Sequence, residues 1–392
     1  MKSYKWFILA SYSFLVALNQ LLWINFASIS SQVQSYYGVS AFYVAFLAII
    51  FPIVYIIFSI PSGIIVDRKG YKYSILLGSV IMFIFSLIRA IEINYILLLI
   101  GQIGIAIAQP LLNNSVSKLA NTEFQMNEVT MAIGLGTLAI FIGVAAGMIV
   151  PPIIIEFISI QTMLYILSIV VLIAMLLNFL ATRFSHKIES YGKTEIHFAK
   201  VIKFREIMIL SYIAFVGMGI FNGILTWIDS IFQHVSISML QAGEIGLSLV
   251  LGGIFGSIII PYLSSKYGRR KIFVSIAIIV TIIILLIYMM IPNFIILVLL
   301  SLILGFFLLG AFPLIIDWAT VITGSKYAGS ATAVIWLLGQ TGGFILPLLM
   351  GINFLTLPDN TYFVSFLIFA ILIIPGFVLI LKIQERRSFP HK

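Results

Sequence analysis

Twelve long apolar runs, separated by short polar segments, limit what this chain can fold into. The runs span residues 5–29, 42–66, 73–91, 95–117, 128–153, 161–181, 207–231, 242–264, 270–291, 294–319, 329–351 and 360–382. An α-helix of about 20 residues crosses the roughly 30 Å hydrocarbon core of a bilayer. Helices are suited to this because they satisfy their main-chain hydrogen bonds internally. The sequence therefore predicts an all-α membrane protein with twelve transmembrane helices.

The composition excludes a soluble domain. Hydrophobic residues make up 62% of the chain and charged residues only 9%. A water-soluble chain of this length needs far more charged side chains on its surface. The sequence contains no cysteine, which excludes disulfides and thiol chemistry.

The positions of the basic residues predict the orientation. Cytoplasmic loops of membrane proteins collect Lys and Arg. If the N-terminus lies inside, every Lys and Arg except Arg89 falls on the inner side, and Arg89 is a candidate partner for an ion pair with Glu92. We expect a multi-pass protein of the cell membrane with both termini in the cytoplasm. The net charge of +9 then reflects topology and anionic lipid, with no nucleic-acid partner.

The chain contains an internal repeat. The stretch "GIIVDRKGYK" at 63–72 is echoed by "PYLSSKYGRR" at 261–270, an offset of 198 residues. A second echo, at an offset of 196, matches Gly143, Gly147 and Pro151 with Gly339, Gly343 and Pro347. We expect two pseudo-symmetric six-helix halves, 1–182 and 207–392, joined by a cytoplasmic linker, 183–206. Transporters built from parallel repeats have this plan, with the substrate at the interface of the repeats.

The loop between the second and third runs carries a family motif. The pattern GxxxDRxGxK, repeated in weaker form in the second half, resembles the loop motif of the major facilitator superfamily. The resemblance implies gating residues: Gly63, Asp67, Arg68, Gly70, Lys72, Lys266, Gly268 and Arg270. Asp67 would pair with Arg68 and cap a neighbouring helix end, which holds the halves together on the cytoplasmic side. The alternative, that these charges only set topology, explains the basic residues but not Asp67 or the glycines.

Longer stretches resemble one branch of this superfamily. They are "ALNQLLWINFASISSQVQSYYGVS" (17–40), "GQIGIAIAQPLLNNSVSKLA" (101–120), "GVAAGMIVPPIII" (143–155) and "AGEIGLSLVLGGIFGSI" (242–258). They are similar to the feline leukaemia virus subgroup C receptor family. That resemblance implies transport of choline or ethanolamine, or, by an older attribution, haem export. The family has tyrosine at Asn222, glutamine at Phe141 and proline at Val116 of this chain.

Polar and aromatic residues follow single faces of several predicted helices. Residues three and four apart share a helix face, and a face that lines a cavity carries such groups. The candidate substrate-binding residues are Asn19, Trp23, Gln109, Asn113, Phe141, Asn222, Thr226, Trp336 and Gln340. Each amide could instead make an interhelical hydrogen bond. Trp23 matches the family's tryptophan and suits a quaternary ammonium, although an interfacial belt position is the alternative.

Intramembrane ionisable residues are the default candidates for coupling. Asp229 and Asp317 are the two candidates in this chain, and neither is centred in an apolar run. This placement favours facilitated diffusion over proton antiport. The four histidines lie outside the runs, which disfavours a histidine ligand for haem while leaving Tyr and Met as ligands.

The functional prediction is a secondary transporter. We expect it to move a small organic solute, a choline-like cation being the candidate, by alternating access and facilitated diffusion. The alternative is a proton-coupled exporter of drugs, metabolites or haem. The sequence shows no nucleophile–base set, phosphate loop or metal-ligand cluster, so we expect no enzyme activity, no cofactor and no metal. The expected partners are the small-molecule substrate and the lipid bilayer, and the expected assembly is a monomer.

Overall fold

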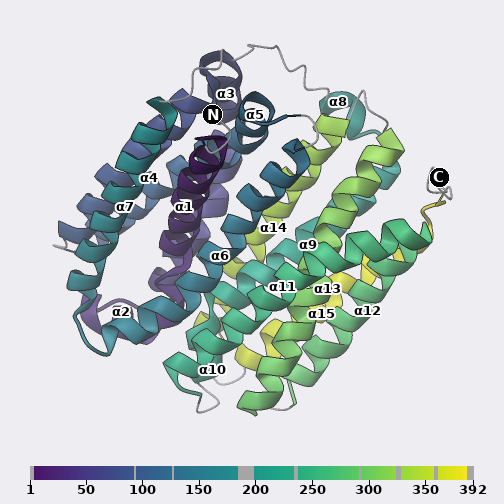
Figure 1. Ribbon diagram of the computed structural model, residues 1–392. Coiled ribbons are helices and arrows are strands. Elements are labelled where there is room, and N and C mark those ends of the chain that lie inside the picture. Colours follow the sequence, from purple (N-terminus) through teal and green to yellow (C-terminus); the bar gives the residue numbers. More distant parts are fainter. Residues whose placement is uncertain are drawn as a thin grey trace. The chain divides into compact units, whose positions relative to one another are not determined.

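The computed structural model is all-helical over the residues that it describes, which are 4–91, 94–125, 128–183, 198–233, 237–290, 293–323, 328–356 and 361–385. Figure 1 shows the arrangement of the helices. In chain order they are α1 (Tyr4–Ile24), the 3₁₀ helix η1 (Ala27–Ile29), α2 (Ser30–Tyr37), α3 (Ala41–Ile91), α4 (Tyr95–Asn113), α5 (Ser115–Glu123), α6 (Val129–Ile155), α7 (Ile160–Arg183), α8 (Phe198–Val201), α9 (Arg205–Thr226), α10 (Ile228–Gln233), α11 (Met239–Tyr267), α12 (Arg270–Tyr288), α13 (Phe294–Thr323), α14 (Ala328–Thr356) and α15 (Thr361–Leu381).

The helices form two compact units. Unit 1 comprises Met1–Thr194 and unit 2 comprises Glu195–Lys392. Within the described residues, 12 segments are long and apolar enough to cross a membrane, six in each unit. This confirms the predicted fold of twelve transmembrane helices. Much of the predicted linker, residues 184–197, lies outside the described residues, so the linker bounds 183–206 stay a prediction.

Three of the predicted helices are broken. The run 5–29 ends as a helix at Ile24 and continues through η1 and α2. The run 95–117 divides at Asn114 into α4 and α5, and the run 207–231 divides at Trp227 into α9 and α10. The prediction of continuous helices was wrong here because hydropathy averaged over a whole run is insensitive to a local break. Neither Pro110 nor Pro313 marks a break, since Pro110 lies inside α4 and Pro313 inside α13.

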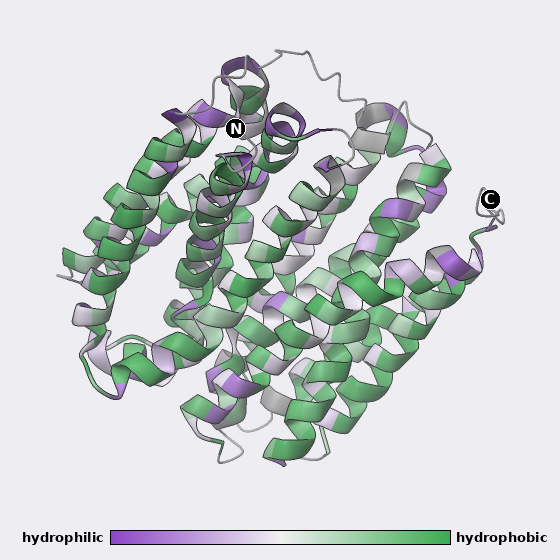
Figure 2. Cartoon of the chain, viewed as in Figure 1, coloured by the Kyte–Doolittle hydropathy of each residue, from purple (hydrophilic) through white to green (hydrophobic). Residues whose placement is uncertain are grey.

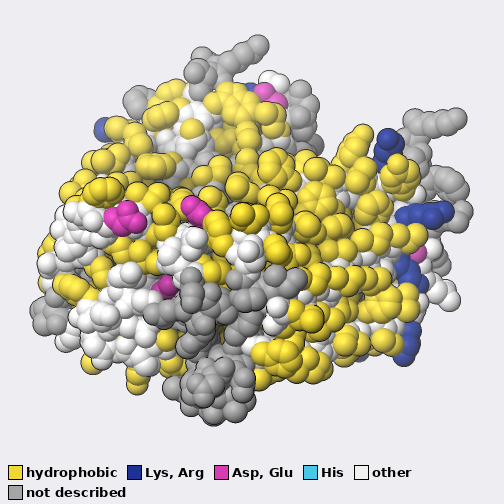
Figure 3. Space-filling model, turned by 90° about the horizontal axis from the view of Figure 1, so that it is seen from below, with side chains coloured by type: hydrophobic (Ala, Val, Ile, Leu, Met, Phe, Trp, Pro, Cys, Tyr) yellow, Lys and Arg dark blue, Asp and Glu magenta, His cyan; other side chains and the backbone are white. Residues whose placement is uncertain are grey.

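The surface of the bundles suits lipid. Hydrophobic residues cover most of the helix surfaces, and polar residues concentrate toward the helix ends (Figure 2). On α7, for example, Ile169 is 56% exposed and Ile173 is 48% exposed. Hydrophobic side chains also cover much of the surface seen in Figure 3. Such broad apolar exposure is stable in a bilayer and not in water.

The repeated glycines bring two helices of each unit into close contact. A Cβ atom on Gly143 of α6 would lie 2.1 Å from the carbonyl oxygen of Ala17 in α1. In unit 2, a Cβ atom on Gly342 of α14 would lie 1.8 Å from the carbonyl oxygen of Phe215 in α9. Close backbone approach between helices requires residues this small. The repeat therefore marks a tight pair of helices in each unit, although the backbone contact between α9 and α14 is at Gly342 and not at the aligned Gly339, where a Cβ atom would meet the side chain of Met218 at 3.3 Å.

Replacing Gly143 with alanine should destabilise unit 1, because the added methyl group would overlap the backbone of α1. The expected cost is about 1–3 kcal/mol, the range for overpacking a tight contact. Thermal unfolding of purified protein in detergent would then show a Tm several degrees below that of the unsubstituted chain.

Gly134→Ala provides the matched control in the same helix. A Cβ atom there meets nothing within 4 Å, and alanine has the higher helix propensity. Its Tm should be unchanged or slightly raised. Equal losses at both positions would contradict a packing role for Gly143.

Candidate functional site

Trp23 and Asn19 lie on α1 and are both buried within unit 1. Trp23 is 7% exposed, and its indole Nε1 donates to the carbonyl oxygen of Ala48 at 3.0 Å. Its ring centroid lies 6.4 Å from that of Phe51, with the planes tilted by 45°. Asn19 Nδ2 donates to the carbonyl oxygen of Ile105 in α4 at 3.2 Å. Asn19 thus makes an interhelical hydrogen bond, which the sequence analysis gave as the alternative to lining a cavity.

Gln109, Asn113 and Phe141 are the other candidates in unit 1. Gln109 is 7% exposed, and its amide makes no hydrogen bond to a described residue. Asn113 is half-buried, and its Oδ1 is a buried acceptor that likewise has no hydrogen-bond partner among the described residues. Phe141 on α6 is half-buried. The two α4 amides therefore keep hydrogen-bonding capacity that the fold of unit 1 does not use.

Asn222 occupies a tight position against α14 in unit 2. Its Nδ2 donates to the carbonyl oxygen of Gly343 at 3.4 Å, and its Oδ1 is buried without a hydrogen-bond partner in the described part of the chain. A Cβ atom on Gly343 would lie 2.3 Å from that Nδ2, so glycine leaves the space that the amide fills. Thr226, at the end of α9, is 3% exposed.

The remaining candidates of unit 2 lie on α14. Trp336 and Gln340 are both half-buried, one turn apart. The ring of Trp336 packs edge to face against Phe312 of α13, with centroids 4.8 Å apart. Each unit therefore carries a tryptophan in contact with a phenylalanine.

Asp229 does not lie on the same helix as Asn222, so the two residues do not share a helix face. The sequence placed both residues on one helix, but α9 ends at Thr226, and Asp229 lies in α10 beyond the break at Trp227. Asp229 is 3% exposed. Trp227 donates through its Nε1 to the carbonyl oxygen of Pro347 in α14 at 2.9 Å, as Trp23 does to α3 in unit 1.

The two motif loops share a glycine turn. Gly70, where α3 is interrupted between its two spans, has a φ of 86°, and Gly268, between α11 and α12, has a φ of 62°; glycine adopts this left-handed conformation at little cost. Next to the first turn, the buried hydroxyl of Tyr71 donates to Glu123 at the end of α5. This bond joins the motif loop to the helix that follows the α4 break.

The other motif residues of the first loop are less enclosed. Arg68 is exposed, and Gly63 and Lys72 are half-buried. The side chain of Asp67 lies outside the described part of the structure, so its pairing with Arg68 stays a prediction.

In unit 2 the motif loop is tied down by an ion pair. Lys266 is exposed, but Arg270 Nε lies 2.6 Å from Asp317 Oδ2 in α13. The neighbouring Lys271 donates through Nζ to the carbonyl oxygens of Leu381, the last residue of α15, and of Ile383, at 2.7 and 3.0 Å. The family resemblance predicted a gating role for Arg270, whereas Lys271 was counted only among the charges that set topology. The carboxylate of Asp317, a coupling candidate, is neutralised by Arg270.

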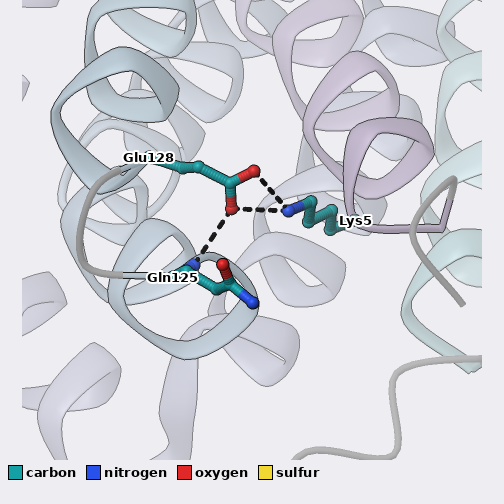
Figure 4. Close-up of polar contacts among 3 residues, drawn as sticks. All are labelled: Lys5, Gln125 and Glu128. Atoms are coloured by element: carbon teal, nitrogen blue, oxygen red, sulfur yellow. Dashed lines mark hydrogen bonds and ion pairs between the residues drawn. The ribbon is translucent and has the colours of Figure 1, made fainter.

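A second ion pair was missed by the sequence analysis. Lys5 Nζ on α1 lies 2.6 and 2.5 Å from the two carboxylate oxygens of Glu128, the residue that precedes α6 (Figure 4). Glu128 also accepts from the main-chain nitrogen of Gln125 at 3.2 Å. Lys5 was counted only among the topology-setting charges, because 123 residues separate it from its partner.

Arg89 is buried and bonded to amides and a carbonyl. Its Nη1 donates to Gln102 Oε1 at 2.9 Å, and Gln102 in turn donates to the carbonyl oxygens of Leu22 and Trp23 at 2.9 and 3.3 Å. Glu92, its predicted partner, lies outside the described residues. Gln102 thus satisfies main-chain carbonyls in the last turn of α1, beside Trp23.

This geometry defines a polytopic helical membrane protein built from two six-helix units. Among known folds, it is similar to a crystal structure of a bacterial homologue of the human lysosomal transporter Spinster in an inward-facing, occupied conformation. The TM-score is 0.77 at 15% sequence identity, over 97% of both chains. At this identity the likeness concerns the fold alone.

The sequence comparisons give the family. The Major Facilitator Superfamily model matches residues 12–347 and 207–391, and this chain belongs to that superfamily. It is 36% identical over 149 residues to an uncharacterized protein of Archaeoglobus fulgidus, covering 38% of this chain and 69% of that protein. It is 24% identical over 395 residues to the choline/ethanolamine transporter flvcr2a of Danio rerio, covering 93% and 84%. The human choline/ethanolamine transporter FLVCR2 is 23% identical over 394 residues, with 93% and 75% covered. The predicted resemblance is thereby confirmed.

The ion pair in unit 2 yields a testable distinction between anchoring and proton coupling. If Arg270 and Asp317 act together to position the motif loop, Arg270→Gln and Asp317→Asn should slow transport to similar extents. The double variant should be no slower than the slower single variant, because both substitutions remove one interaction. Stability should fall by less than about 1 kcal/mol, since the Asp317 side chain is 51% exposed.

Initial transport rates in proteoliposomes measure this effect, and Arg269→Gln is the control because Arg269 is exposed and adjacent. A proton-coupling role for Asp317 predicts something else. In that case Asp317→Asn alone would impair transport, and Arg270→Gln would leave the rate unchanged.

Proposed function

We propose that this superfamily transporter carries a small quaternary or primary ammonium compound, choline being the reference substrate, by alternating access and facilitated diffusion. Membership of the superfamily establishes a membrane-embedded transporter of a small molecule. The substrate class and the mechanism are the proposal. The relatives named as choline/ethanolamine transporters support it over most of the chain.

The observation that carries this proposal is the environment of Trp23. Its indole N–H is already used by Ala48, so the ring can offer a ligand only its π-face. A tryptophan face attracts a desolvated ammonium by about 2 kcal/mol or more. Phe51 stands beside it as a second ring. A ring face without a competing donor is the chemistry that recognises a methylated cation.

The remaining candidates supply polar groups of the right kind. Gln109 and Asn113 have unused amide capacity for the hydroxyl of choline or ethanolamine. Phe141 adds apolar surface, and Asn19 fixes α1 against α4 through its bond to Ile105. Substrate binding by these residues would require no carboxylate.

Unit 2 offers a related set of groups. Trp336 presents a second tryptophan, and Gln340 lies one turn away on the same helix. The buried Oδ1 of Asn222 is an acceptor, and Thr226 carries a hydroxyl one turn further along α9. We propose that these four residues also contribute to substrate transport.

The second candidate is a proton-coupled exporter of drugs, metabolites or haem. Buried Asp229 favours it, because an acid that is 3% exposed could carry a proton. All four histidines lie outside the described residues, so a histidine ligand for haem stays untested by the structure. We further propose a monomer in the cell membrane with both termini in the cytoplasm, based on the distribution of Lys and Arg.

The experiment compares choline with 3,3-dimethylbutan-1-ol, a neutral molecule of the same shape, by calorimetry on purified protein. A site that depends on a ring face should bind choline and not the neutral analogue. Trp23→Leu should weaken choline binding by roughly 1–2 kcal/mol, about 5- to 30-fold, and Trp23→Phe should weaken it less.

Trp6→Leu is the control, since Trp6 lies at the start of α1 and packs on Phe124 instead of Phe51. It should keep choline affinity. The proposal fails if choline and its neutral analogue bind equally, or if Trp23→Leu matches the unsubstituted chain. A porphyrin that binds where choline does not would favour the second candidate.

A further inference from the structure

Arg89 is a buried cation that the proposed transport path does not use. It lies near the end of α3, and its side chain is 0% exposed. The structure shows no ion pair between it and a described carboxylate. A buried charge is unfavourable by several kcal/mol unless an opposite charge or hydrogen bonds compensate it.

Only one of the three guanidinium nitrogens of Arg89 donates hydrogen bonds to described residues. All three hydrogen bonds that Arg89 donates to described residues come from Nη1, to the Leu22 carbonyl oxygen at 3.3 Å, Asn25 Oδ1 at 3.4 Å and Gln102 Oε1 at 2.9 Å. The ring of Phe26 lies 5.1 Å from the guanidinium carbon and adds a cation–π contact. These groups are neutral, so the charge itself has no counterion among the described residues.

The polar atoms of Arg89 and Asn25 that lack a hydrogen-bond partner among the described residues are all donors. Arg89 Nε and Nη2 are buried without a hydrogen-bond partner in the part of the chain that the structure describes. The same holds for Nδ2 of Asn25, whose other amide atom accepts from Arg89. A guanidinium and an amide nitrogen donate and cannot accept. The chemistry missing from this cluster is an acceptor with a negative charge.

We propose that Arg89 and Asn25 form a buried binding site for a small monovalent anion, for which chloride is the probe. The anion would accept from Arg89 Nε and Nη2 and from Asn25 Nδ2, and it would neutralise the guanidinium. Water could fill the same hydrogen bonds but would leave the charge uncompensated.

The site would act on the break in α1. Arg89 and Gln102 both donate to the carbonyl of Leu22, close to where α1 ends at Ile24. Neutralising Arg89 lowers the energetic cost of keeping it buried there. Anion binding would therefore stabilise the folded state, by the general relation between ligand concentration and stability.

The test measures Tm in detergent at constant ionic strength while chloride replaces gluconate, an anion too large for a buried pocket. The unsubstituted protein should show a saturable rise of about 2 °C or more with chloride. Asn25→Asp is the decisive variant, because it places a carboxylate of nearly equal size against Arg89. Its Tm in gluconate should exceed that of the unsubstituted protein and should not respond to chloride.

Asn94→Asp is the matched control. Asn94 is exposed at the N-cap of α4, where aspartate caps equally well, and it adds the same charge to the same unit. This variant should keep the full chloride response. The proposal is overturned if the unsubstituted protein does not respond to chloride, if Asn25→Asp responds as strongly, or if Asn25→Asp is less stable than the unsubstituted protein in gluconate.

Discussion

In unit 1, α1 ends within the apolar region, and the main-chain carbonyls of its last turn need hydrogen-bond donors there. The arrangement of unit 1 around α1 depends on how these donors are supplied. Water cannot supply the missing donors in the hydrocarbon core, so side chains must do so. At the end of α1, Gln102 donates to the carbonyls of Leu22 and Trp23, and Arg89 donates to that of Leu22. These bonds hold the last turn of α1 against α4 and α3. The position of Trp23, and with it the proposed ammonium site, depends on them.

The two repeats share kinds of interaction more than they share identical residues. Each unit packs its first and fifth spans tightly through glycine, at Gly143 in unit 1 and at Gly342 in unit 2. Each unit also fixes a tryptophan near a helix break by an indole bond to a main-chain carbonyl, Trp23 to Ala48 and Trp227 to Pro347. The motif loops use different bonds for one purpose, since a hydroxyl anchors the first loop and an ion pair anchors the second.

Hydropathy and the motif were enough to predict the twelve spans and the family, because burial in lipid and loop charge leave strong patterns. They did not predict the breaks after Ile24 and Thr226, since hydropathy averaged over a run is insensitive to a local break. Periodicity placed Asn19 on a polar face but could not show that its amide meets a carbonyl of α4. Lys5 lies 123 residues from Glu128, and Arg89 lies 64 residues from Asn25, so only the fold brings these partners together.

The central claim is that the chain moves an organic cation down its own electrochemical gradient. Electrical recording from proteoliposomes on a solid support tests this most directly. A choline jump at equal pH on both sides should give a saturable current carrying positive charge inward, and the neutral analogue should give none. An imposed pH gradient alone should drive no choline accumulation at zero potential. Choline accumulation driven by that gradient, or no choline current at any concentration, would contradict the account.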